Sequence, residues 1–259
     1  MQTIIINFDP ILVQLGPLRV SWYGLMYVFG FLASYFLVLC QMKKKDFGIT
    51  RQEMDSIYFY LALGLVIGAR LGYVFFYDLI LYLKNPFEIL SIWHGGMSFH
   101  GGLIGVLAGW FIFCWKNKKS FWRTADLFVV TAPIGLGLGR IGNFINAELY
   151  GRVTQVPWGM IFPKGGPLPR HPSQLYESAL EGGVLFLILW FMKDEKLPPG
   201  GLLAAFLSLY GGFRFFLEFF REPDVQLGFV LGPFTMGQVL SSLMIAAGIF
   251  LFFFLKKKG

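Results

Sequence analysis

Charged side chains are scarce in this chain of 259 residues. They make up 14% of it, whereas 56% of the residues are hydrophobic and the mean hydropathy is +0.61. Soluble domains carry about 25% charged residues. The composition therefore excludes an ordinary soluble domain and predicts an integral membrane protein.

Cysteine and histidine are also rare. Cys40 and Cys114 each precede a lysine cluster, so we expect both near the cytoplasmic face, where a disulfide is disfavoured. Neither has a histidine close to it in sequence, and a catalytic thiol is not expected. The three histidines, at positions 94, 100 and 171, are too dispersed for a metal motif, so we expect no metal and no cofactor. No serine-centred elbow appears, which leaves lipase-type acyl transfer unsupported.

The net charge of +7 raises the question of nucleic-acid binding. The lysines gather instead at the ends of apolar runs, as in Lys43–Lys45 and Lys256–Lys258. This placement is typical of the positive-inside rule, and we expect no nucleic-acid partner. The basic loops predict an N-terminus outside, on the periplasmic side, and a cytoplasmic C-terminus.

The apolar runs predict an all-α integral membrane protein with seven transmembrane helices. We expect a single domain over residues 1–259, with an interfacial arm at 1–19 and a Pro/Gly-rich outer loop at 149–173. We expect no cleavable signal peptide, and no internal repeat supports an inverted-repeat transporter. The predicted spans are 20–40, 54–79, 97–115, 121–144, 174–192, 200–220 and 234–255.

One stretch, Gly135–Arg152, places polar residues at the end of an apolar run; it reads GLGLGRIGNFINAELYGR. Arg140 inside a predicted span is costly and predicts a function with a partner. The glycines permit close backbone approach and a break in the helix, which could present N–H groups beside the guanidinium to an anion. A phospholipid head group is the anion that suits this depth. The glycines could instead be packing residues only. The match to GxGxxG is rejected as a dinucleotide fingerprint, because no strand precedes it.

Other polar residues fall in the outer half of the predicted spans. Tyr210, Arg214 and Glu218 share one helix face, and the last two can pair. His100 could exchange protons near neutrality or be a buried structural histidine. Tyr23 could be an aromatic-belt residue. Arg221 could be solvated or contact lipid phosphate, and the pair Glu177 and Glu181 and the residue Asp126 receive no function. Gly101, Gly105 and Gly109 predict a packing ridge.

Four segments carry a family resemblance over essentially the whole chain. They are HGGMSFHGGLIG (94–105), GLGRIGNFINAELYGR (137–152), RHPSQLYES (170–178) and YGGFRFFLEFFREPD (210–224). They resemble the bacterial prolipoprotein diacylglyceryl transferases. The resemblance implies a multi-pass enzyme of the bacterial cytoplasmic (inner) membrane that transfers a diacylglyceryl group from phosphatidylglycerol to the lipobox cysteine of a prolipoprotein. The product is a thioether, and glycerol phosphate leaves.

The resemblance also implies roles for individual residues. His100 is the candidate base for the substrate thiol, since thiolate is the nucleophile. Arg140 and Arg214, with Tyr210, are the candidates for holding the phosphate and stabilising its departing charge. The candidate substrate-binding residues are Tyr23, Arg140, Asn143, Glu148, Gly151, Glu218 and Arg221.

Two alternatives stay open at the level of sequence. A lipid binder or flippase would also place arginines in a lipid-facing cleft, but it would not need His100. A cytidylyl-type phospholipid transferase would need several acidic metal ligands, and the sequence does not offer them.

Overall fold

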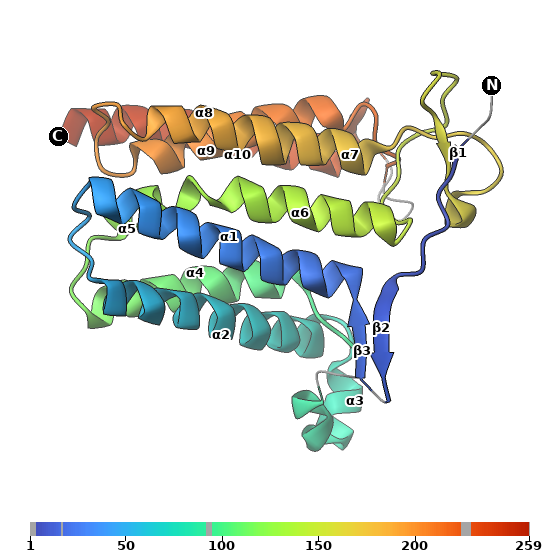
Figure 1. Ribbon diagram of the computed structural model, residues 1–259, viewed down its shortest axis with the longest axis horizontal. Coiled ribbons are helices and arrows are strands. Elements are labelled where there is room, and N and C mark those ends of the chain that lie inside the picture. The colour runs from blue at the N-terminus through green and yellow to red at the C-terminus, as the bar shows by residue number, and fades with distance from the viewer. Residues whose placement is uncertain (1–3, 17, 92–94, 224–228, 259) are drawn as a thin grey trace. The chain divides into compact units, whose positions relative to one another are not determined.

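The computed structural model describes residues 4–16, 18–91, 95–223 and 229–258, so His94 and Asp224 lie outside the described residues. The chain forms two compact units. The first unit comprises Met1–Gln41 and Ala125–Gly259, and the second comprises Met42–Thr124. Figure 1 labels the helices and strands of both units.

Helices dominate both units. In the second unit α2 (Arg51–Phe76), α3 (Leu79–Lys84), the 3₁₀ helix η1 (Pro86–Leu90) and α4 (Phe99–Lys116) follow in order. Two helices cross the boundary between the units, α1 (Trp22–Lys44) and α5 (Phe121–Val129). The first unit continues with α6 (Ala132–Ile145), η3 (Pro163–Gly165), α7 (Ser173–Glu177), the π-helix η4 (Ser178–Val184), α8 (Leu185–Met192), α9 (Gly201–Leu217) and α10 (Met236–Lys258).

Several of these helices can cross a membrane. Four are long and apolar enough by length and composition: α1, α2, α10 and the continuous helix Ser173–Met192 formed by α7, η4 and α8. The pair α5 and α6, bent by 46°, adds a fifth if it forms one span. Large apolar side chains face outward on them, such as Phe36, 60% exposed, and Phe250, 71% exposed. An apolar exterior of this kind suits lipid, so the protein is a helical, multi-pass membrane protein.

The predicted position of the helix break is wrong. The chain bends between α5 and α6, at Val130 and Thr131, and not at the glycines of 135–142. Pro133 opens α6, where its missing N–H costs nothing, and the Thr131 hydroxyl donates to the carbonyl of Phe128 at 2.8 Å. Because α6 runs unbroken through the glycines, their N–H groups serve the helix and cannot be presented to an anion.

Gly135, Gly137 and Gly142 serve close packing instead. In the first unit α6 lies between α1 and the α7–α8 helix (Figure 1). A Cβ atom on Gly30 of α1 would lie 3.1 Å from the Cα atom of Gly135. In the second unit a Cβ atom on Gly105 would clash with the carbonyl oxygen of Gly64, and Gly101 and Gly109 make similar contacts along α2. The predicted ridge is thus confirmed as a close crossing of α2 and α4.

The arm and the outer loop contain short strands. β1 (Ile4–Ile5) pairs in parallel with β4 (Met160–Ile161), and β2 (Ile11–Leu15) pairs antiparallel with β3 (Leu18–Ser21). A third pair, β5 (Phe229–Leu231) with β6 (Phe234–Thr235), precedes α10. Fully buried Phe162 stacks on Tyr150 with 5.5 Å between ring centroids. The outer loop thus has a small core of its own.

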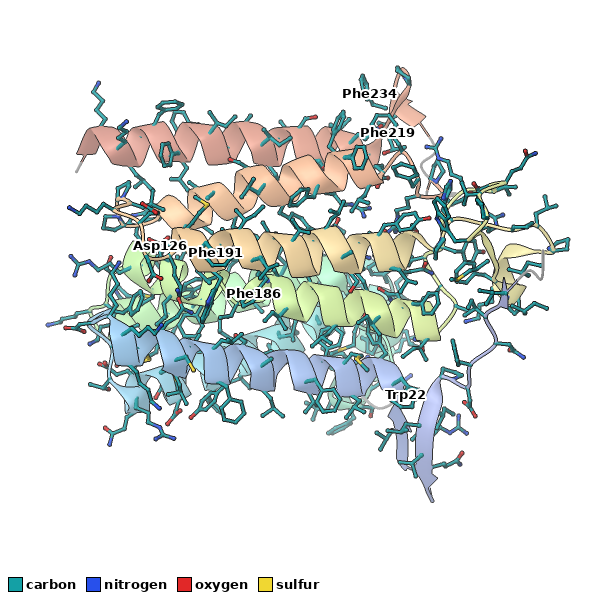
Figure 2. All side chains as sticks on the ribbon, turned by 45° about the horizontal axis from the view of Figure 1, so that its top comes forward. Trp22, Asp126, Phe186, Phe191, Phe219 and Phe234 are labelled. Carbon is teal, nitrogen blue, oxygen red and sulfur yellow. The ribbon has the colours of Figure 1, made fainter. Side chains whose placement is uncertain are left out.

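Asp126 anchors the opposite end of the first unit. Its carboxylate accepts the N–H of Gly200 at 2.6 Å and the N–H of Leu203 at 3.1 Å. These are free donors at the start of α9, where a carboxylate also suits the helix dipole. In Figure 2 this residue lies at one end of the helices, and Phe219 and Phe234 lie at the other. Asp126 is therefore paired with a helix N-terminus.

Candidate functional site

Six charged side chains form one cluster inside the first unit. We call it the arginine–glutamate cluster. α6 supplies Arg140, the α7–η4 helix supplies two carboxylates, and α9 with the turn after it supplies the rest. Its members are Arg140, Glu177, Glu181, Arg214, Glu218 and Arg221.

Glu177 lies at the centre of the cluster because it contacts all three arginines. Its Oε2 atom lies 2.6 Å from Nε of Arg140 and 3.5 Å from Nη1 of Arg214. Its Oε1 atom accepts from Nη1 of Arg221 at 3.4 Å. Glu181 adds two longer contacts, 3.7 Å to Arg140 and 3.8 Å to Arg214.

Arg214 bridges this centre to Glu218 one turn further along α9, with 2.7 Å from Nη2 to Oε2. The predicted pair is thus confirmed. Thr235 fixes the same carboxylate from outside the helix by donating its hydroxyl to Oε1 at 3.0 Å. Gly237 leaves room for it, since a Cβ atom there would lie 2.6 Å from Oε1. Glu218 is therefore held on two sides.

The cluster depends on a close crossing of α6 with the π-helix. A Cβ atom on Gly182 would lie 2.6 Å from the Cα atom of Gly137. Contact at this distance brings Arg140 of α6 level with Glu177 and Glu181. π-helical turns are rare and occur frequently at functional sites.

Burial makes the charge balance of the cluster important. The side chains of Glu177 and Glu181 are 1% and 0% exposed, whereas that of Arg140 is 20% exposed. Three cations and three carboxylates cancel among the described residues. Uncompensated charges would be costly at this depth, so each group requires its partners. Arg140 is the most accessible arginine of the three.

A second polar group lies around Glu148, which follows the C-terminal end of α6. Asn143 and Asn146 donate their amide groups to Oε1 of Glu148 at 2.9 and 3.3 Å. The residues on either side of Glu148, Ala147 and Leu149, have φ of 51° and 57°. Non-glycine residues rarely adopt this conformation, which is found preferentially at functional sites. The sequence alone gave no signal of this strain.

Tyr23 lies close to this second group. Its hydroxyl is 3.1 Å from that of Tyr27, and its ring packs against Gly142, where a Cβ atom would lie 2.7 Å from the ring. A side chain at position 142 would therefore displace the tyrosine. Gly142 immediately precedes Asn143 on α6, the helix that carries Arg140, so Tyr23 packs beside Asn143.

Gly151 joins the outer loop to Arg221 through the backbone. The two residues form a β-bridge, and the N–H of Gly151 donates to the carbonyl of His171 at 2.9 Å. A Cβ atom at Gly151 would lie 2.5 Å from the carbonyl oxygen of Phe220. Any other residue would therefore shift the segment that carries Arg221.

The two remaining predicted catalytic residues are Tyr210 and His100. Tyr210 lies one turn before Arg214 on α9, within electrostatic range of Glu181 and Arg140, and stacks on Phe206 with 5.6 Å between ring centroids. His100 is the second residue of α4 in the second unit, and its side chain is exposed. The exposure overturns the alternative of a buried structural histidine. Ser98 caps this helix by accepting the N–H of Gly101 at 3.3 Å.

The sequence gave no role to three groups that the structure makes prominent. Glu177 and Glu181 are two acids spaced i, i+4 in an apolar span, and this spacing was itself a usable signal.

Arg70 is the third of these groups and is 4% exposed. Its guanidinium lies over the Tyr82 ring and donates to the backbone carbonyls of Glu88, Ile89, Ser91, Gly95 and Gly96. It organises the segment before α4 through acceptors that no sequence motif reveals.

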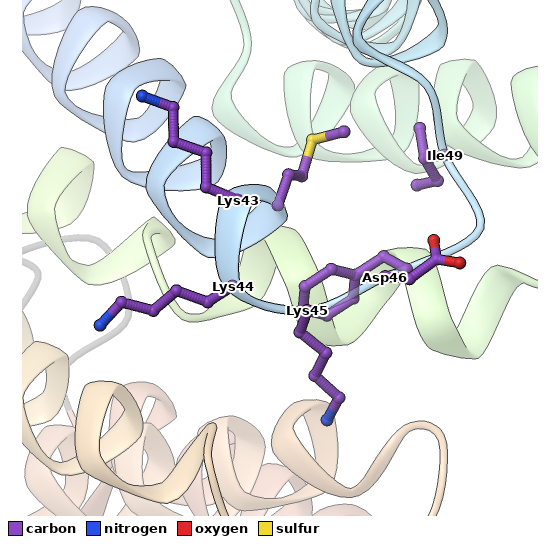
Figure 3. Close-up of a pocket in the computed structure, with 7 residues that line it drawn as sticks. Lys43, Lys44, Lys45, Asp46 and Ile49 are labelled. Carbon is purple, nitrogen blue, oxygen red and sulfur yellow. The ribbon is translucent and has the colours of Figure 1, made fainter.

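A separate hollow lies where α1 ends. Figure 3 shows Lys43, Lys44 and Lys45 extending in different directions around it, with Asp46 and Ile49 on the following turn. The lysines do not converge on one point. The hollow fits a solvated basic loop better than a binding site.

Comparison with known proteins agrees with the sequence motifs. Residues 10–254 match the family described as prolipoprotein diacylglyceryl transferase. Three relatives are named phosphatidylglycerol–prolipoprotein diacylglyceryl transferase. One from Desulfotalea psychrophila is 55% identical, covering 95% of this chain and 92% of the relative. One from Geobacter sulfurreducens is 51% identical and covers 94% of each chain. One from Vibrio campbellii is 52% identical and covers 98% of this chain and 93% of the relative. Identity at this level over nearly the whole length leaves no doubt about kinship, and the chain belongs to the prolipoprotein diacylglyceryl transferase family.

Proposed function

We propose that this protein transfers the diacylglyceryl group of phosphatidylglycerol to the lipobox cysteine of prolipoproteins in the bacterial cytoplasmic membrane. Its relatives carry the name of this activity and align with it over nearly their whole length, which supports the proposal. The observation that carries the proposal is the arginine–glutamate cluster within an apolar helical bundle. Guanidinium groups hold phosphate through paired donors, and phosphatidylglycerol brings an anionic phosphodiester to the membrane.

The reaction is a displacement at carbon. The substrate thiolate attacks the carbon of the diacylglyceryl group that carries the phosphate ester oxygen, and a carbon–sulfur bond forms. The carbon–oxygen bond breaks, and glycerol phosphate leaves with the electron pair. The thiol proton passes to His100, which is proposed as the general base. The leaving phosphate gains negative charge, and Arg140 with Arg214 stabilises that charge.

The remaining residues orient these groups. Glu218 holds Arg214, and Asn143, one turn beyond Arg140 on α6, donates to Glu148. Gly151 supports the backbone at Arg221. Tyr23 and Tyr210 border this region from α1 and α9. Their proposed roles are contacts with the lipid head group or with the arginines.

The proposed topology has seven spans, with the N-terminus in the periplasm and the C-terminus in the cytoplasm. Five of the proposed spans are the four long apolar helices and the bent pair α5–α6. The other two are the shorter helices α4, with 18 residues, and α9, with 17 residues. The basic residues at the ends of α1, α4 and α10 support the orientation. Leu168→Cys and Glu195→Cys, each in a variant without native cysteines, test it. An impermeant thiol reagent should label the first from the periplasm and the second from the cytoplasm only.

Mass spectrometry of a lipobox peptide tests the proposed activity. Purified protein in phosphatidylglycerol vesicles should add the mass of one diacylglyceryl group to the peptide. A peptide with serine in place of cysteine should gain nothing. Lipid binding without any mass increase would support a lipid binder or flippase instead.

A further inference from the structure

We propose that Glu177 and Glu181 are positioning residues whose negative charges keep the empty arginine–glutamate cluster neutral, so that the phosphate product is released. This inference rests on the proposed function. It deepens that function by assigning roles to two buried acids of the cluster.

The contacts divide the arginines into two kinds. Arg214 directs Nη1 to Glu177 and Glu181 and Nη2 to Glu218, so both terminal nitrogens face carboxylates. Arg140 uses Nε and Nη2 for the same two acids. Its Nη1 enters no ion pair with the part of the chain that the structure describes. A guanidinium has five N–H donors, so Arg140 can hold both acids and still contact a phosphate.

Glu177 sets the spacing of the cluster. A single carboxylate lies within 3.5 Å of a nitrogen of each of the three arginines. It thereby holds three like charges together that would otherwise repel one another. Glu181 acts mainly through its negative charge and does little to position the arginines. Neither of its oxygens accepts a hydrogen bond from the described residues, and its distances to Arg140 and Arg214 are 3.7 and 3.8 Å.

The charge balance matters more for the product than for the substrate. Phosphatidylglycerol presents a phosphodiester with one negative charge. Glycerol phosphate is a monoester, and at neutral pH such a group carries about −1.5 to −2. A cluster with three uncompensated cations would hold the product more strongly than the substrate. The two buried acids prevent this by competing with the product for the same guanidinium groups.

Removing the charge of Glu177 should raise the affinity of the protein for glycerol phosphate. In Glu177→Gln, the inhibition constant of glycerol phosphate should fall by about tenfold or more, since a neighbouring charge commonly changes the affinity of a site for a charged ligand by that factor. Turnover should fall as well. Glu177→Asp keeps the charge but shortens the reach, so turnover should fall while the inhibition constant stays within about threefold of wild type. Glu195→Gln, at an exposed position, serves as the control.

The experiment measures peptide lipidation against glycerol phosphate concentration for purified wild type and these variants, with thermal unfolding on the same samples. An unchanged or weaker inhibition by glycerol phosphate in a folded Glu177→Gln protein would overturn the proposal. If that variant does not fold, Glu181→Gln replaces it, and the same tightening is required. If wild type does not lipidate the peptide, the proposed function fails; if wild type is active and the variants show no tightening, only this inference fails.

Discussion

Gly137 of α6 and Gly182 of the π-helix approach so closely that a Cβ atom on Gly182 would lie 2.6 Å from the Cα atom of Gly137. The crossing sets the distance between two backbones, and that distance decides whether Arg140 reaches Glu177. Packing between small residues and the polar cluster are therefore two aspects of one arrangement.

Gly182→Ala should disrupt both. We expect a loss of about 1–3 kcal/mol in stability, as for other overpacked sites, together with a large loss of lipidation. The neighbouring Gly183 is the matched control, since a Cβ atom there meets nothing within 4 Å. Gly183→Ala should leave activity intact and stability unchanged or slightly higher. Thermal unfolding in detergent and the peptide assay measure both. Equal effects of the two substitutions would refute the role of the crossing.

Asp126→Asn should weaken the start of α9 without changing the chemistry. The substitution removes the charge that faces the N–H groups of Gly200 and Leu203. The expected cost is about 1–2 kcal/mol, measured as a lower midpoint of thermal unfolding. Asp194→Asn, at an exposed position in the loop that leads to α9, should cost less than about 0.5 kcal/mol. The folded fraction of Asp126→Asn should keep its specific activity, and a selective loss of turnover would show that our assignment is incomplete.

Stability should fall as the medium becomes acidic, in part through His171. Burial lowers the pKa of His171 below its ordinary value, so the unfolded chain binds a proton more readily than the folded protein. Its contribution is fully present above about pH 6.5, the usual histidine pKa, and is lost as the pH falls below it. In the folded state its Nδ1 lies 3.2 Å from the hydroxyl of Tyr176. The midpoint of thermal unfolding should therefore decline between pH 8 and pH 5, and less steeply in His171→Gln. Identical slopes would contradict the assignment.

His100→Gln should separate thiol chemistry from lipid binding. General-base catalysis contributes about 10²–10⁴-fold, so most thioether formation should disappear. Binding of phosphatidylglycerol should persist, since the phosphate is assigned to Arg140 and Arg214. Peptide lipidation and native mass spectrometry with the lipid are measured on the same sample. Full lipidation by His100→Gln would exclude histidine as the base.

Some of the fold followed from the sequence. The apolar runs predicted the helices, and the pair of Arg214 with Glu218 followed from their spacing. The sequence could not place the break between α5 and α6. Glycine tolerates a break in a helix better than Val130 or Thr131, so the four glycines were the expected position. Helix packing restrained those glycines, and only the partner helix shows this.

The sequence singled out the three arginines and Glu218 of the cluster, but it gave no role to Glu177 and Glu181. Arg140 and Arg214 were evident as costly residues in apolar spans. Glu177 and Glu181 met the same criterion, but their role depends on three arginines from other segments of the chain. The strained residues Ala147 and Leu149 carry no sequence signal at all, because their conformation is set by the structure around them.

The most direct test of the account measures phosphatidylglycerol bound to wild type, Arg140→Ala and Arg123→Ala by native mass spectrometry. Arg123 is an exposed arginine at the start of α5, outside the cluster, and controls for the loss of one positive charge. Arg140 is the arginine whose Nη1 makes no ion pair with the described residues, so removing it should weaken lipid binding by about tenfold or more, as for the loss of a charge-assisted hydrogen bond. Arg123→Ala should bind like wild type. Wild-type lipid binding by a folded Arg140→Ala protein would contradict the assignment of the arginine–glutamate cluster as the head-group site.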